Sequence, residues 1–320
     1  MLLAVFGFAV GLVLLIKGGD WFVDGATGIA HHFHVPEILI GATVVSIGTT
    51  IPEVMVSAAS AIGGHGEIAY GNALGSVICN TALIAAITIA VRPGTVDRKA
   101  LRLPVIFFFI AAVFYCAVAY VTGFFSRVTG LVLLAMFVAY IALSIREASQ
   151  NTGDAGGEAT SEASPFVKLI GLLVIGALLI AVGADLLVDN GTIIATCLGV
   201  PEAVIALTFV ALGTSLPELV TAITSLVKGH SDLSLGNVIG ANLFNLVLVS
   251  GVSSALKPFQ IPVSRTVAGM NATLVVDIPV MMGVMLLICI PAMKKERLYR
   301  SQGIVLLVIY AAFCIFQFVV

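Results

Sequence analysis

Two carboxylates stand inside long apolar stretches of this 320-residue chain, each directly after a proline. The first ends the segment 48–53 (GTTIPE) as Glu53, and the second ends the segment 213–218 (GTSLPE) as Glu218. A charged side chain at the centre of a membrane-spanning helix costs about 2.5–3.5 kcal/mol. Two such residues at corresponding places need a compensating cation or proton, so we interpret both glutamates as functional.

Hydroxyl side chains accompany the first glutamate at helical spacing. On a helix, these side chains would form one polar stripe on an apolar surface, which should face the protein interior rather than lipid. Pro52 has no amide hydrogen and clashes with the carbonyl of Gly48, so the sequence predicts a broken helix with free backbone oxygens. Pro217 predicts the same in the second segment. The stripe consists of Ser46, Thr49, Thr50, Glu53 and Ser57.

Asparagines supply further oxygens after each glutamate. Asn72, Ser76 and Asn80 share one helical face, and Asn237 and Asn245 repeat the pattern with Ala241 in place of the serine. For Asn72 and Asn237, packing and ion contact are equally good interpretations. The combined set of carboxylate, amide, hydroxyl and carbonyl oxygens is typical of hard cations such as Ca²⁺, which takes about 6–8 oxygen ligands.

The two segments belong to an internal repeat with a constant spacing. Glu53 and Glu218 are 165 positions apart, and the same offset relates Asn80 to Asn245 and the segment 35–37 to the segment 200–202. We therefore divide the chain into a first half (1–146), a short polar linker (147–164) and a second half (165–320).

Composition indicates a multi-span membrane protein. Hydrophobic residues make up 60% of the chain and charged residues 10%, against about 25% charged in a soluble domain. The sequence predicts an all-α protein with ten transmembrane helices, five in each half. An odd number of spans per half makes the repeats inverted. The predicted spans are 2–27, 36–62, 67–91, 102–121, 127–146, 166–193, 201–227, 232–256, 269–292 and 301–320.

The positive-inside rule sets the expected orientation. With both termini outside, the inner loops would hold most lysines and arginines, including the cluster 294–300, and the outer loops only Arg127, Lys257 and Arg265. We expect a multi-pass protein of a prokaryotic plasma (inner) membrane, with the linker in the cytoplasm. No basic patch suits nucleic acid, no cofactor is expected, and nothing indicates an oligomeric state.

Other polar residues receive structural interpretations. The five cysteines show no paired spacing, so neither a disulfide framework nor a metal knuckle is predicted. Four aspartates near span ends are assigned to the membrane interface, and three histidines in a short loop are assigned to solvent rather than to a metal. These residues are Asp20, Asp24, Asp185 and Asp189, and His31, His32 and His34.

These motifs resemble the two alpha repeats of the cation/calcium exchanger superfamily, at 41–80 and 206–245, and the likeness covers essentially the whole chain. The resemblance implies an antiporter that exchanges Ca²⁺ for Na⁺ by alternating access, with spans 1 and 6 sliding across a core of spans 2, 3, 7 and 8. The cation ligands that it implies are Glu53 and Glu218, the hydroxyls of Thr49, Thr50, Ser76, Thr214 and Ser215, the amides of Asn80 and Asn245, and the backbone oxygens of Ser46 and Ala211.

Two positions depart from the family pattern. Sodium/calcium members often have an acidic residue at the position of Asn245 and usually a serine at that of Ala241. The resemblance therefore leaves a proton/calcium antiporter as the alternative. A cation channel is a second alternative, against which inverted repeats argue. An intramembrane enzyme is disfavoured, because no metal-binding histidine or nucleophile–base pair accompanies the carboxylates.

Overall fold

The computed structural model describes residues 1–152, 165–198, 213–263 and 265–319. In this part of the chain, nine helical stretches are long and apolar enough to cross a membrane, which confirms an all-α membrane protein. The predicted span 201–227 lies partly outside the described residues, and its described part is the helix Leu216–Lys228.

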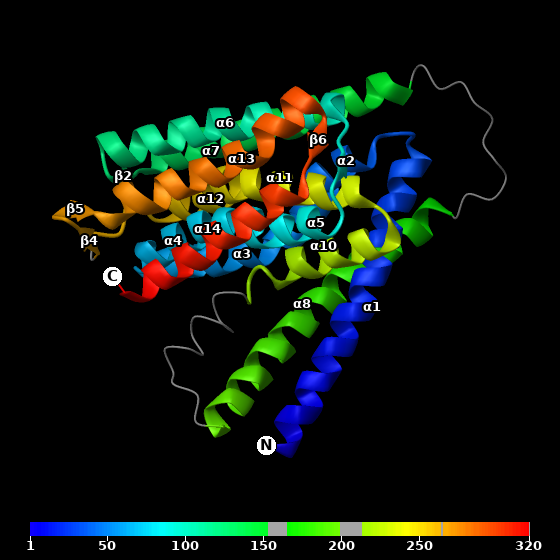
Figure 1. Cartoon of the computed structure of the whole chain (residues 1–320), viewed down its shortest axis with the longest axis horizontal. Helices are drawn as coiled ribbons and strands as arrows, with labels where there is room; N and C mark the ends of the chain where they lie inside the picture. The colour runs from blue at the N-terminus through cyan, green and yellow to red at the C-terminus, as the bar shows by residue number, and fades with distance from the viewer. Residues whose placement is uncertain (153–164, 199–212, 264, 320) are drawn as a thin grey trace.

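The first half contains five spans in sequence order. Two of the spans, α2–η1–α3 and α4–η2–α5, include a π-helical turn, labelled η (Figure 1). Helix α7 continues into the segment predicted as a linker. The elements are α1 (Leu2–His32), α2 (Glu37–Ile40), η1 (Gly41–Val45), α3 (Ser46–Ile62), α4 (Gly66–Cys79), η2 (Asn80–Ala85), α5 (Ala86–Val91), α6 (Arg98–Val121) and α7 (Arg127–Thr152).

The second half repeats this plan, with further π-helical turns in the spans α11–η4–α12 and η5–α13. Its last helix ends at the C-terminus, beside the first half in Figure 1. The elements are α8 (Phe166–Cys197), α10 (Leu216–Lys228), α11 (Ser231–Phe244), η4 (Asn245–Val249), α12 (Ser250–Leu256), η5 (Thr273–Asp277), α13 (Ile278–Lys295) and α14 (Arg300–Val319).

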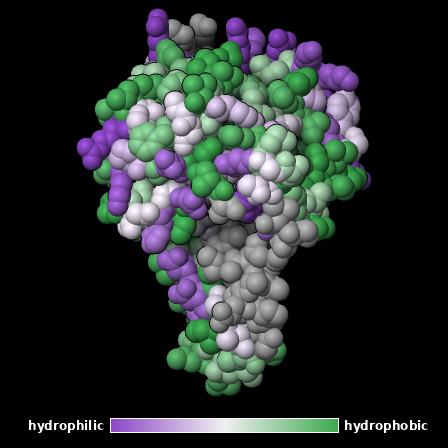
Figure 2. Space-filling view, turned by 90° about the vertical axis from the view of Figure 1, so that its left-hand side faces the viewer, coloured by the Kyte–Doolittle hydropathy of each residue, from purple (hydrophilic) through white to green (hydrophobic). Residues whose placement is uncertain are grey.

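Helix α11 is the centre of the molecule. Every residue from Leu233 to Phe244 is buried, because α11 packs against α2, η1, α3, η2, α6 and α10. Helices α6, α7 and α13 lie on one side of this core (Figure 1). Apolar side chains cover much of the visible surface of the wide upper part and the lowest tip of the molecule (Figure 2). Such a surface suits a lipid environment.

Helices α1 and α8 form a long antiparallel pair that leans away from the core (Figure 1). A Cβ atom on Gly11 would lie 2.9 Å from the Gly183 carbonyl oxygen, and one on Gly18 would lie 2.9 Å from the Gly176 oxygen. The offset of 165 converts the first contact into the second. A two-fold axis that relates two inverted halves would convert one of these contacts into the other in the same way.

Short strand pairs join the halves at both ends of the bundle. Strand β1 (Gly94–Thr95) pairs with β6 (Arg297–Leu298), and β2 (Phe124–Phe125) pairs with β3 (Phe259–Gln260), all antiparallel. Each pair unites loops that the ten-span topology places on one side of the membrane. A third pair, β4 (Thr266–Val267) with β5 (Met270–Asn271), is a local hairpin.

One local prediction is wrong. The expected break at Pro52 does not occur, since α3 runs without interruption from Ser46 to Ile62. The proline removes one hydrogen bond to the Gly48 carbonyl, but packing of the surrounding helices keeps the helix straight enough to continue. The irregularity lies earlier, in the π-helical turn η1. In the second half, Pro217 occupies the first turn of α10, where its missing amide hydrogen costs nothing.

Candidate cation-binding site

Four structural units carry the predicted ligands. Helices α3 and α10 hold the glutamates, whereas α4–η2 and α11–η4 hold the asparagines. Helix α3 packs against α4, α11 and η4, and α10 packs against α11 and η2, so the units from both halves converge. Glu53 and Glu218 lie close enough for their charges to interact.

The polar stripe of α3 faces the protein interior, as its spacing predicted. Glu53 and Thr50 are fully buried, and so is Glu218 on α10. Lipid offers no hydrogen-bond partners, so a stripe of this kind is stable only inside the bundle. The buried members on α3 are Ser46, Thr49, Thr50, Glu53 and Ser57.

Several buried oxygens at this point have no hydrogen-bond partner among the described residues. Buried polar groups are normally paired, because an unpaired one costs about 1–3 kcal/mol. A concentration of unpaired oxygens in one place therefore fits a bound cation, which would supply the missing partner. The unpaired groups are both carboxylate oxygens of Glu53 and Glu218, the amide atoms of Asn80 and Asn245, and the hydroxyl of Thr50.

Reciprocal hydrogen bonds connect the two motifs. Thr49 Oγ1 donates to Asn237 Oδ1 at 3.2 Å, and Thr214 Oγ1 donates to Asn72 Oδ1 at 3.3 Å. The offset of 165 exchanges these bonds as it exchanges the glycine contacts of α1 and α8. Asn72 and Asn237, which the ligand set omitted, thus position the threonines from the opposite half.

Each of these asparagines is also fixed to a neighbouring serine. Asn72 Nδ2 donates to Ser57 Oγ at 2.8 Å. Ser46 Oγ donates to the Asn237 backbone oxygen at 2.9 Å and to the Gly41 oxygen at 2.7 Å. Ser46 is therefore a link between η1 and α11, in addition to its predicted role through its backbone oxygen.

Two π-helical turns begin at the asparagines of the predicted site. η2 starts at Asn80 and η4 at Asn245, at equivalent positions in the two halves. A π-helical turn shifts the backbone hydrogen bonds from i+4 to i+5 and is frequent at functional sites. After η4, Ser250 Oγ donates to the Asn245 backbone oxygen at 3.1 Å. Both amide side chains thus lie where the helical register changes.

The remaining predicted ligands line a neighbouring cavity. Ser76, Thr214 and Ser215 border a cavity of about 430 Å³ between α4, the start of α10 and α14. Its other walls are mainly apolar and include Tyr310 and Phe313. Thr214 and Ser215 belong to the second glutamate motif, and Ser76 of α4 lines the same cavity. Ala211 lies outside the described residues.

The α1–α8 pair lies directly against the glutamate motifs. Pro52 and Pro217 border one small cavity together with Phe22 of α1 and Ile180 of α8. A Cβ atom on Gly48 would lie 3.2 Å from the Phe22 ring, so this glycine lets α1 approach α3 closely. Helices α1 and α8 therefore lie beside the prolines that precede the two buried glutamates.

The histidine loop and the interfacial aspartates are only partly as predicted. Within the described residues, no group of three or more His, Cys, Asp or Glu side chains is arranged to hold a metal ion. The His31 side chain is 76% exposed, yet it lies 3.8 Å from Glu37. Glu37 also contacts His230, and Lys228 contacts Asp24. The contacts of His230 with Glu37 and of Lys228 with Asp24 join residues about 200 positions apart, so no local sequence pattern predicts them.

Comparison with known families places these motifs in context. The family described as Sodium/calcium exchanger protein matches residues 3–146 and 168–319, which together are nearly the whole chain. The uncharacterized membrane protein MJ0091 of Methanocaldococcus jannaschii is 34% identical over 310 residues, covering 97% of this chain and 96% of the relative. The sodium/calcium exchanger MaX1 of Methanosarcina acetivorans is 31% identical and covers 97% of both chains.

Solved structures agree with the sequence relatives. The chain is similar to the sodium-calcium exchanger NCX_Mj soaked with Na⁺ and Sr²⁺, with a TM-score of 0.81, 32% identity and 97% of each chain covered. The resemblance inferred from the two motifs is thereby confirmed. The named relatives are exchangers and membrane proteins, which supports a cation/calcium antiporter and a multi-pass membrane location. The chain belongs to the sodium/calcium exchanger family.

Proposed function

We propose that this protein exchanges Ca²⁺ for Na⁺ by alternating access, with the ions bound between α3, α4–η2, α10 and α11–η4. The observation that carries this proposal is the set of buried oxygens without partners around Glu53 and Glu218. The set contains two carboxylates and otherwise neutral oxygens, which is chemistry for a hard cation.

Charge explains why the two ions would exclude each other. Two ionised glutamates carry a charge of about −2, which one Ca²⁺ or two Na⁺ would neutralise. An unloaded pair of buried carboxylates is unfavourable, so the protein would change conformation only with ions bound. The gradient of one ion would then drive the other against its own gradient.

The proposed motion uses the α1–α8 pair. The glycine contacts between these helices bring their backbones close together, so they can move as one unit. Because Phe22 and Ile180 lie against Pro52 and Pro217, displacement of the pair would open the glutamates to one side at a time.

The direct test is transport in sealed vesicles. Vesicles loaded with Na⁺ and containing the purified protein should take up Ca²⁺ until the Na⁺ gradient is collapsed. Ca²⁺ uptake driven by a pH gradient without Na⁺ would instead establish the proton/calcium alternative, since unloaded carboxylates can bind protons. Ca²⁺ flux that needs no counter-ion at all would establish a channel.

Substitution of the glutamates tests the site itself. Glu53→Gln or Glu218→Gln should reduce Na⁺-driven Ca²⁺ uptake about 100-fold or more, because removing one charge of a buried ionic group costs about 3–5 kcal/mol. Glu67→Gln is the matched control, since this exposed carboxylate lies on α4 outside the site. Unchanged exchange in both glutamate variants would refute the proposed site.

A further inference from the structure

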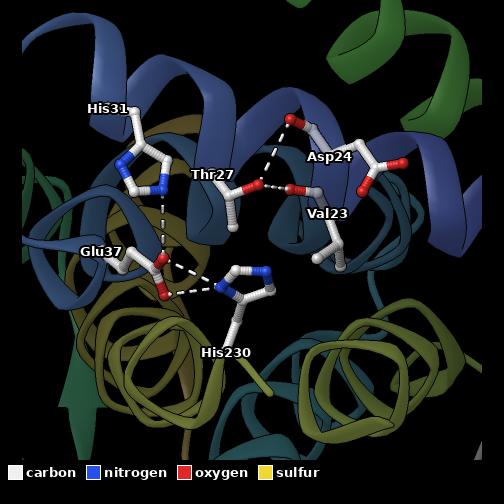
Figure 3. Close-up of polar contacts among 6 residues, drawn as sticks. All are labelled: Val23, Asp24, Thr27, His31, Glu37 and His230. Carbon is white, nitrogen blue, oxygen red and sulfur yellow. Dashed lines mark hydrogen bonds and ion pairs between the residues drawn. The ribbon is translucent and has the colours of Figure 1, made fainter. Parts of the chain in front are cut away.

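A cluster of ionisable side chains ties α1 to the core at one end of the molecule. Figure 3 shows Glu37, the first residue of α2, between two imidazoles. His230 Nδ1 lies 2.9 Å from Glu37 Oε1 and 3.1 Å from Oε2. His31 Nε2, in the last turn of α1, lies 3.8 Å from Oε1. One carboxylate thus links the end of α1 to the turn between α10 and α11.

Lys228, two residues before His230, makes a second connection to α1. Lys228 Nζ lies 2.7 Å from Asp24 Oδ1 and 3.5 Å from Asp20 Oδ1, and it donates to the Asp20 backbone oxygen at 3.0 Å. Lys228 ends α10, and a single glycine separates it from His230. We name the six residues of both connections the α1 clasp: Asp20, Asp24, His31, Glu37, Lys228 and His230.

Only part of the clasp is repeated in the sequence: the offset of 165 relates Glu37 to Glu202 and His230 to His65. The offset of 165 relates Lys228 to Gly63 and His31 to Thr196, whereas Asp20 and Asp24 correspond to Asp185 and Asp189. Within the described residues, no ion pair forms at either of these α8 aspartates. Among the described residues, the lysine connection of the clasp therefore occurs on α1 and has no equivalent on α8.

We propose that the α1 clasp is a proton-responsive lock, which tightens on acidification and holds α1 against the end of α10. Histidine is the side chain whose charge ordinarily changes between about pH 5 and pH 8. A neutral His230 can only donate a hydrogen bond to Glu37, while protonated His230 and His31 add two positive charges beside this carboxylate.

Charged side chains on the packed elements surround the two histidines of the clasp. Asp232 of α11 and Arg92 at the end of α5 line the same cavity as Glu37. The carboxylate of Asp97, which caps α6, is close enough to Asp232 for their charges to interact. With Asp20 and Asp24 on α1 and the cations Arg92 and Lys228, these are the charged groups that face the clasp from the packed elements.

This inference concerns the position of α1 and does not depend on which cations are exchanged. Trp21, the only tryptophan of the chain, lies on α1 between Asp20 and Asp24. Val227 at the end of α10 is 80% exposed and can carry a label. A nitroxide on Val227→Cys, with the five native cysteines replaced, would quench Trp21 fluorescence when α1 and α10 are in contact.

The expected result is stronger quenching at about pH 5.5 than at about pH 8. Two partly exposed ion pairs should shift the ratio of bound to released α1 about two- to fivefold. The response should disappear in the double variant His31→Gln/His230→Gln and in Glu37→Gln. It should persist in His34→Gln, which removes an exposed histidine from the turn that follows α1.

Two outcomes would overturn the proposal. One is Trp21 quenching that does not change with pH in the labelled protein whose six clasp residues are all intact. The other is an unchanged pH response in the double histidine variant. Na⁺-driven Ca²⁺ uptake at about pH 8 serves as the separate check that each variant is folded. Absence of Na⁺-driven Ca²⁺ uptake in the protein with the unmodified clasp, together with a retained pH response of the quenching, would contradict the proposed transport function and leave the clasp intact.

Discussion

Asn245 is the residue that most directly sets the charge of the proposed site. It is fully buried, and neither of its amide atoms has a hydrogen-bond partner among the described residues. The amide atoms of Asn80, the equivalent residue in the first half, also have no hydrogen-bond partner among the described residues. With asparagine at both positions, only Glu53 and Glu218 contribute formal charge, which limits the number of cations that can bind together.

We predict that Asn245→Asp increases the number of Na⁺ ions exchanged for each Ca²⁺. The new carboxylate would make the site more negative, from about −2 to about −3, so one more monovalent cation would be needed for neutrality. The measurement is the Na⁺ gradient at which net Ca²⁺ flux in vesicles is zero. Asn190→Asp adds the same charge on α8, away from the site, and should leave the ratio unchanged. An identical ratio in Asn245→Asp would contradict the charge argument.

The glutamates and their hydroxyl neighbours were predictable from the sequence, whereas their polar partners were not. The sequence predicts a functional role for Glu53 because a carboxylate is costly in an apolar stretch. The bond from Thr49 to Asn237 joins residues that are 188 positions apart. Such a contact follows from how the halves pack together, and neither local spacing nor residue type reveals it.

At the scale of elements, the α1–α8 pair depends on glycine at the contact points. A Cβ atom on Gly18 would lie 2.8 Å from the Ile180 nitrogen and 2.9 Å from the Gly176 oxygen. Both neighbours are backbone atoms, which cannot rotate away as a side chain could. Any side chain at this position must push the helices apart.

We therefore predict that Gly18→Ala destabilises the protein by about 1–3 kcal/mol, the usual cost of overpacking. The thermal unfolding midpoint in detergent would report the change. Gly171→Ala is the matched control on α8, because a Cβ atom there would meet nothing within 4 Å. That substitution should be neutral or stabilising by about 0.4–1 kcal/mol. Equal midpoints for the two variants would show that the close approach is unimportant.

The spans were predictable as elements, but their internal irregularities were not. Hydropathy located the described helices to within a few residues, since about 20 apolar residues are needed to cross the hydrocarbon. The π-helical turns at Asn80 and Asn245 left no such signal. Their hydrogen-bond register depends on tertiary packing. The same packing carries α3 through Pro52, where propensity alone predicted a break.

At the scale of the whole molecule, the loops sort into two ends. The pair β1–β6 joins two loops that the topology places on one side, and the pair β2–β3 joins two loops on the other. Arg92 Nη1 donates to the Leu226 oxygen at 3.4 Å at the first end, and Lys257 Nζ donates to the Ile62 oxygen at 3.2 Å at the second. The first end carries most of the positive charge, which the positive-inside rule assigns to the cytoplasm.

We predict that the loop containing Lys295 faces the cytoplasm and that the loop containing Gln260 faces outside. Both side chains are exposed, so Lys295→Cys and Gln260→Cys should react readily in a variant that lacks the native cysteines. In intact cells, a membrane-impermeant maleimide should label only the second variant. In inside-out vesicles, it should label only the first. The reverse pattern would place both termini in the cytoplasm.

The strand pairs and the threonine–asparagine bonds have a consequence for how this architecture can be built. The pairs β1–β6 and β2–β3 and both threonine–asparagine bonds join residues 1–152 to residues 213–319, an arrangement that resembles a two-fold dimer whose subunits are connected in one chain. A true homodimer repeats each interface residue on both sides. It would carry Lys228 at both ends or at neither, and the equivalent positions 76 and 241 could not hold serine in one half and alanine in the other. Fusion of the subunits is therefore what allows the two faces of the membrane to meet unequal ends of the same fold.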